Sequence, residues 1–172
     1  MKKGIHFIIT GGTIDSVYDG SKDTVVPSGS SILPDVMKLI KSELPLEFTE
    51  ICMKDSRNLT AEDLGAVLDA VQKSEFSKII ITHGTYTMPD SARFLKAHLG
   101  GDIDKTIILT GSVIPIKGFS PSDGTFNIGY AVGQIEHLTP GVYVAMNARI
   151  FSPEEVIKRM STATFESILG EK

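Results

Sequence analysis

The sequence predicts an α/β fold: a doubly wound, mainly parallel sheet with helices on both faces. Three observations favour this class. Short apolar runs alternate along the chain with longer segments of helical periodicity. The runs are nearly continuous in Ile, Val and Leu, as strands buried on both faces require. Polar loops follow the runs, and three of these loops carry glycine directly after the run. The 172 residues are enough for one domain with a sizeable core, so we expect a single domain over 1–172.

Five apolar runs are expected to form the sheet. Each is short enough for a strand and is bounded by turn-forming residues. They are Ile5 to Ile9, Phe48 to Met53, Lys78 to Ile81, Thr106 to Leu109 and Val142 to Met146.

Five segments are expected to be helical. The second opens T-A-E-D, which resembles a capping box, and the third begins with a proline, which the first turn of a helix tolerates. They are Ile32 to Lys41, Thr60 to Val71, Pro89 to Leu99, Asn127 to His137 and Pro153 to Met160, and the tail after Thr162 is expected to end in helix. The segment from Asp15 to Ser31 has no apolar period and is expected to be a mobile loop over the functional site.

Composition excludes several classes of function. The net charge of −4 gives no basic face for nucleic acid and no polybasic membrane anchor. No apolar stretch approaches the roughly 18 residues of a membrane span, and the N-terminal run of about five residues is too short for a signal peptide. Cys52 is the only cysteine, which fits a reducing compartment. We therefore expect a soluble, cytoplasmic protein.

Small polar residues gather where the predicted strands end. They form the clusters Thr10 to Thr13, Lys54 to Ser56, Thr82 to Thr85 and Thr110 to Ser112. Ligands of open α/β sheets bind beyond the carboxyl ends of the strands, so one site is expected there.

Taken singly, the motifs leave alternatives open. I-I-T-G-G-T-I could present the Thr13 hydroxyl, form a plain turn, or bind phosphate, but the fuller G-x-G-x-x-G and Walker patterns are absent. In I-T-H-G-T-Y-T-M, Thr85 follows the glycine and can face a cleft, whereas His83 is expected to pack beneath the loop. Ser112 belongs to ordinary loop chemistry. No metal or cofactor is expected.

Taken together and in order, the motifs resemble the N-terminal domain of the bacterial-type L-asparaginase family. The motifs span nearly the whole chain. They are T-G-G-T-I, D-S-R-N-L, H-G-T-x-T-M, T-G-S-x-x-P with S-D-G-x-F-N, and V-I-K after G-V-Y-V-A-M-N. The resemblance implies that Thr13 is the nucleophile of an acyl-enzyme mechanism, assisted by Tyr18. It also implies that Thr85 and Lys158 are catalytic. Without it, Lys158 would be read as an exposed lysine on a helix.

The resemblance also implies a substrate-binding set. Ser56 matches the serine that holds the substrate α-carboxylate, and the backbone of Ser112 matches the support of the amide end. The full expected set is Gly12, Asp55, Ser56, Gly84, Tyr86 and Ser112. The chemistry is consistent, because a threonine hydroxyl needs a base, and a buried lysine can act as one through Thr85.

Two departures from the family pattern bear on activity. Tyr86 stands where the family has an aspartate that holds the α-ammonium and supports the lysine, and a phenol cannot replace that charge. Asp55 or Asp15 could compensate. The sequence also ends at Lys172, where larger members continue into a C-terminal domain that completes a neighbour's site. A homo-oligomer, dimer or tetramer, would have to replace that contribution.

Three functions follow as hypotheses. The first is an asparaginase-like amidohydrolase that cleaves the side-chain amide of asparagine or a related small amide, including one without an α-ammonium. The second is a degenerate small-ligand-binding module that keeps the cleft without turnover. The third, suggested by the fold alone, is a nucleotide-binding protein.

Overall fold

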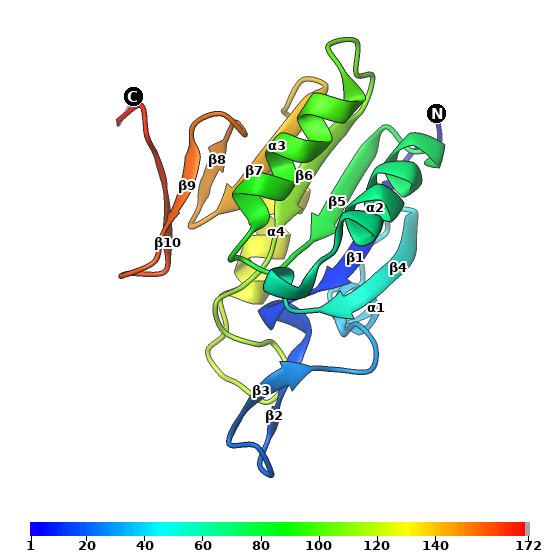
Figure 1. Cartoon of the computed structure of the whole chain (residues 1–172). Helices are drawn as coiled ribbons and strands as arrows, with labels where there is room; N and C mark the ends of the chain where they lie inside the picture. The colour runs from blue at the N-terminus through cyan, green and yellow to red at the C-terminus, as the bar shows by residue number, and fades with distance from the viewer. Residues whose placement is uncertain (171–172) are drawn as a thin grey trace.

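A six-stranded sheet forms the centre of the molecule, seen in a computed structural model that describes residues 1–170 (Figure 1). The strand order is β4-β1-β5-β6-β7-β8, and all neighbours are parallel except the antiparallel pair β7–β8. The bounds are β1 Ile5–Gly11, β4 Leu46–Lys54, β5 Lys78–Thr82, β6 Thr106–Thr110, β7 Gly141–Met146 and β8 Arg149–Phe151. The mainly parallel α/β class is therefore confirmed, and β8 is a strand that the apolar runs did not predict.

Helices cover both faces of this sheet. Figure 1 shows α2 (Ala61–Lys73) and α3 (Met88–Leu99) in front of it, and α1 (Leu33–Leu39) and α4 (Gly124–Gln134) behind it. The strands divide their side chains between the two layers: Ile79 and Ile81 of β5 pack with α2 and α3, whereas Ile80 packs with α4. Full burial of such a side chain stabilises the fold by about 1.5–3 kcal/mol as an upper estimate.

The predicted helix starts have the expected local chemistry. Thr60 caps α2 in a reciprocal capping box with Asp63, and Pro89 lies in the first turn of α3. The capping box supplies acceptors for backbone N–H groups that have no partner inside the helix, and proline lacks the N–H group that would be left without a partner there. The four helices before residue 140 are thus confirmed, with ends that differ from the predicted ones by a few residues.

The predicted helix from Pro153 to Met160 is wrong. The chain there forms β9 (Val156–Arg159), which pairs antiparallel with β10 (Thr164–Ser167), so the expected helical tail is wrong as well. Val156 and Phe165 turn inward and join the core beside α3, and Arg93 of α3 donates from Nη2 to the carbonyl of Val156 at 2.7 Å. Contacts made across the fold override the local helical pattern.

The expected loop from Asp15 to Ser31 has regular structure. A single 3₁₀ turn, η1 (Thr13–Asp15), leads into a hairpin of β2 (Ser16–Asp19) and β3 (Thr24–Pro27). The hairpin extends beyond the carboxyl end of the sheet (Figure 1). Within residues 1–170, no helix is long and apolar enough to span a membrane.

Candidate active site

Three strand ends meet with their backbones in contact. Gly12, which follows β1, has a φ of 87°, and a Cβ placed on it would lie 2.5 Å from the backbone of Gly84, which follows β5. A Cβ on Gly84 would in turn lie 2.7 Å from the side chain of Ser56, after β4. Only glycine allows this close approach at positions 12 and 84, so the Gly-Gly and His-Gly motifs bring the neighbouring threonines together.

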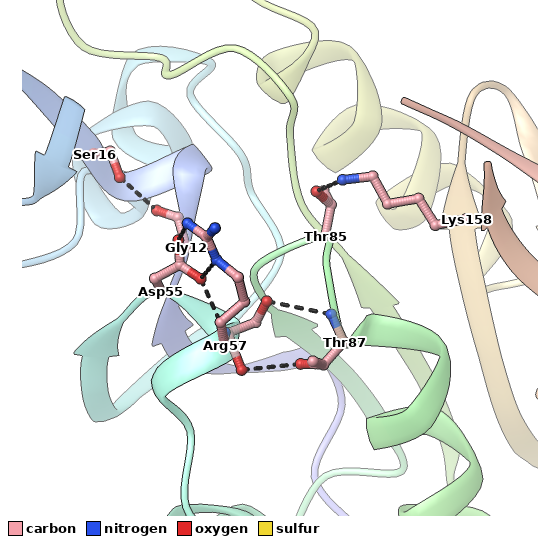
Figure 2. A network of polar contacts seen from close by, with 8 residues as sticks. Gly12, Ser16, Asp55, Arg57, Thr85, Thr87 and Lys158 are labelled. Carbon is pink, nitrogen blue, oxygen red and sulfur yellow. Dashed lines mark hydrogen bonds and ion pairs between the residues drawn. The ribbon is translucent and has the colours of Figure 1, made fainter. Parts of the chain in front are cut away.

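A lysine and a threonine are joined at this point. Lys158 lies on β9, and its Nζ donates a hydrogen bond to Oγ1 of Thr85 at 2.6 Å (Figure 2). Thr85 is 6% exposed. Burial lowers the pKa of Lys158 and the positive charge of Arg57 lowers it further, against an opposing effect of Asp55. A lysine whose neutral form is favoured in this way is suited to accept a proton from a hydroxyl.

A small cavity of about 120 Å³ lies over this pair. Most of the site residues expected from the sequence line this cavity, and they come from the ends of β1, β4 and β5 and from β9. The lining residues are Gly12, Thr13, Asp55, Ser56, Arg57, Gly84, Thr85, Tyr86 and Lys158. Two threonines, a lysine and a serine therefore surround one small volume.

Asp55 is held by a cation. Arg57 donates from Nε to Oδ1 of Asp55 at 3.0 Å and from Nη2 to Oδ2 at 2.8 Å (Figure 2). These bonds lower the pKa of Asp55. The guanidinium also lies 5.6 Å from the centre of the Tyr86 ring. The sequence reasoning did not single out Arg57, although its place in D-S-R-N-L, two residues after Asp55, was a usable signal.

Ser56 is buried and tied to the start of α3. The hydroxyl group of Thr87 donates to the carbonyl of Ser56 at 3.0 Å, and the backbone N–H of Thr87 donates to Oγ of Ser56 at 3.3 Å. These bonds fix the Ser56 turn against the loop that carries Thr85, so the two sides of the cavity are positioned together.

Two expected site residues lie outside this cavity. Tyr18 is on β2 with 56% of its surface exposed, and its hydroxyl donates to Asp23 at 2.6 Å, which raises the pKa of the phenol. Ser112 is fully buried after β6 and does not line the cavity. Tyr18 therefore does not point at the threonines in this conformation.

Two further residues have structural roles. His83 is buried, donates from Nδ1 to the carbonyl of Gly84 at 2.7 Å, and has its pKa lowered by burial to about 4. It packs beneath the loop, as expected. Asp15 accepts hydrogen bonds from Ser31 and Ile32 and does not line the cavity, so of the two candidate compensating carboxylates only Asp55 reaches it.

Known proteins are similar to this chain in sequence and in fold. The family model "Asparaginase, N-terminal" matches residues 4–170. A glutaminase-asparaginase of Pseudomonas fluorescens biotype A is 36% identical over 182 residues, covering 96% of this chain and 49% of the relative. The glutaminase-asparaginase of Acinetobacter glutaminasificans is 29% identical over 174 residues, covering 95% and 52%. The chain thus spans about half the length of these curated relatives.

Solved structures of L-asparaginases have a similar fold over nearly the whole of this chain. A probable cytoplasmic L-asparaginase from Campylobacter jejuni superposes with a TM-score of 0.79 at 29% identity, over 96% of this chain and 53% of that one. The thermostable L-asparaginase from Thermococcus kodakarensis gives 0.80 at 26% identity, over 97% and 52%. With a family model that covers nearly all its residues, this chain belongs to the asparaginase N-terminal domain family.

Proposed function

We propose that this protein is an amidohydrolase that uses a threonine nucleophile to cleave the side-chain amide of asparagine or a related small amide. The observation that carries the proposal is the hydrogen bond from Lys158 to Thr85, at a cavity that Thr13 also lines. A hydroxyl group beside a lysine of lowered pKa is the pairing that nucleophilic amide cleavage needs.

The proposed reaction has two stages. Oγ1 of Thr13 attacks the amide carbon and forms a C–O bond, while its proton passes through Thr85 to Lys158. The C–N bond breaks, and that proton leaves with the nitrogen as ammonia. Water then cleaves the ester to release the acid and returns a proton to Thr13. Backbone N–H groups at the strand-end turns would stabilise the oxyanion, an effect of about 3–4 kcal/mol per donor in other enzymes. The N–H of Gly12 would not be one of them, because it donates to the carbonyl of Lys54 at 2.8 Å.

The remaining residues bind or position the substrate in this proposal. Ser56 lines the cavity and would contact the acid end of the substrate, beside the guanidinium of Arg57 that Asp55 positions. Ser112 is proposed to support the amide end through its backbone. Tyr18 would assist Thr13 only if the hairpin of β2 and β3 moved toward the cavity, since its hydroxyl now bonds Asp23.

The direct test is ammonia release from asparagine, glutamine and simpler primary amides. Wild-type protein and Thr13→Ser are expected to release ammonia, the serine variant more slowly, and Thr13→Ala is expected to be inactive. Circular dichroism of each variant controls for folding. If Thr13→Ala were as active as wild type, the assigned nucleophile would be wrong.

One observation favours the second function, a ligand-binding module without turnover. The single carboxylate that lines the cavity is paired with Arg57, which leaves none uncommitted to hold an α-ammonium group. Tight binding of a small acid with no ammonia release from any amide would support this alternative. A Tyr86→Asp change should then create or raise asparaginase activity.

We also propose that the protein works in the cytoplasm as a homo-oligomer. The Campylobacter jejuni relative is described as a probable cytoplasmic enzyme. An apolar groove between α1 and α4 supports self-association; it is lined in part by Val36, Leu39, Ile128 and Val132, and Leu39 is 80% exposed. Light scattering should give a mass of at least a dimer, and Leu39→Lys should reduce it. A monomeric wild type at micromolar concentration would refute the oligomer.

A further inference from the structure

No uncommitted carboxylate lines the active-site cavity. Of the residues that line it, Arg57 and Lys158 are basic and Asp55 is the single carboxylate. Asp55 receives two hydrogen bonds from the guanidinium of Arg57, one on each oxygen, and a third from the backbone N–H of Arg57. Its charge is therefore matched by Arg57, and no negative charge in the cavity lining is left for a ligand.

This arrangement disfavours an ammonium group. A substrate ammonium in the cavity would lie near the Arg57 guanidinium and would meet a carboxylate whose oxygens already accept hydrogen bonds from Arg57. Tyr86 adds a phenol, which supplies no formal negative charge to hold the ammonium. Burying an ammonium without a free anionic partner is unfavourable, so an amino acid should bind here more weakly than its analogue that lacks the amino group.

The same arrangement favours a carboxylate. Arg57 uses Nε and Nη2 for Asp55, and Nη1 has no protein acceptor among the contacts of residues 1–170. The guanidinium is held by its two bonds to Asp55 and lies 5.6 Å from the centroid of the Tyr86 ring, at the mouth of the cavity that both residues line. Charge-assisted bonds from guanidinium to carboxylate are among the strongest polar contacts that proteins make.

We propose that the preferred substrate is the monoamide of a short dicarboxylic acid, a molecule with one amide and one carboxylate but no α-ammonium, and that Arg57 determines this specificity. The cavity of about 120 Å³ suits an acyl chain as short as that of succinamic acid. The identity of the scissile bond rests on the proposed function, whereas the preference between ligand charges is a property of binding alone.

The kinetic test uses three amides of similar length. Asparagine carries both charges, succinamic acid only the carboxylate, and 3-aminopropanamide only the ammonium. Wild type should prefer succinamic acid over asparagine by about tenfold or more in kcat/KM and should not turn over 3-aminopropanamide, since each charged hydrogen bond is worth about that factor. Arg57→Gln should lose that preference, and Tyr86→Asp should shift it toward asparagine. Arg159→Gln removes a cation that pairs with Glu166 outside the cavity, so it should leave the preference for succinamic acid in kcat/KM unchanged.

The binding test separates this inference from the proposed function. Calorimetry compares succinate with aspartate on wild type, Arg57→Gln and Arg57→Lys, and the lysine variant keeps the charge in case the glutamine variant does not fold. Succinate should bind about tenfold more tightly than aspartate. If that holds while no amide releases ammonia, the proposed catalysis fails and the inference stands. A preference for asparagine or aspartate, or binding of neither acid, overturns the inference whatever the catalytic result.

Discussion

Replacing Lys158 by methionine should abolish catalysis while leaving the fold intact. Methionine keeps the length of the unbranched stem and removes only the amine that lies 2.6 Å from Oγ1 of Thr85. That distance is within the reach of a general base, whose contribution is about 10²–10⁴-fold in rate. The activation free energy should therefore rise by about 3–5 kcal/mol.

The effect on stability should be small by comparison. The Lys158 side chain donates one hydrogen bond to a neutral hydroxyl, and losing such a bond costs about 1 kcal/mol. Part of this loss is offset because the variant no longer buries an amine when it folds. Ammonia release should be measured beside urea unfolding for Lys158→Met, for Lys158→Arg, which stays charged and cannot act as a base, and for the neighbouring control Arg159→Met. Both Lys158 variants should be inactive and the control active. A Lys158→Met protein within threefold of wild type would refute the assigned base.

Three further changes test the surroundings of this pair. Gly84→Ala should lower the free energy of unfolding by about 1–3 kcal/mol, because its Cβ would lie 2.7 Å from the nearest side chain. The control Gly65→Ala in α2 places a Cβ with nothing within 4 Å and should raise the free energy of unfolding by about 0.5–1 kcal/mol. Urea titrations of both variants measure these changes. Arg57→Gln should move the pH profile of kcat/KM to higher pH, because it removes a cation that lowers the pKa of Lys158, and an unmoved profile would contradict this. The burial of His83 lowers its pKa to about 4, so the unfolded chain binds the extra proton and stability should fall by up to about 3 kcal/mol between about pH 6.5 and 4. His83→Gln should flatten that dependence, and an unchanged slope would refute the assignment.

The sheet was predictable because buried parallel strands leave a strong mark on sequence. Runs such as Lys78 to Ile81 are apolar on both faces, and the structure buries alternate residues against different helix layers. The clusters of Gly, Ser and Thr at the strand ends located the site for the same reason, since parallel strands deliver their carboxyl ends to one edge.

The element that carries Lys158 was not predictable in the same way. The segment P-E-E-V-I-K-R-M satisfies helical preferences locally, and its strand conformation depends on pairing with β10 and on burying Val156 and Phe165 against the core. Such pairing is a property of the folded chain. The family resemblance placed Lys158 in the site although the helix assigned to it was wrong.

Side-chain partners were also beyond the reach of sequence reasoning. The phenol of Tyr18 turns toward Asp23 because the hairpin of β2 and β3 brings the two together, and a pattern that reads as loop does not contain that register. Arg57 was overlooked because a lone arginine in a loop is usually a solvated charge. Only the geometry shows it bound to Asp55 and lying over the Tyr86 ring.

The central claim is that Thr13 forms a covalent acyl-enzyme. The most direct measurement is acid quenching of the enzyme during turnover of its best amide, followed by proteolysis and mass spectrometry of the peptide that contains Thr13. An ester of the substrate acid on Thr13, absent from Thr13→Ala and from Lys158→Met, in which the first stage is blocked, is the result expected. An adduct on Thr85 instead, or steady ammonia release with no adduct and an active Thr13→Ala protein, would contradict the account.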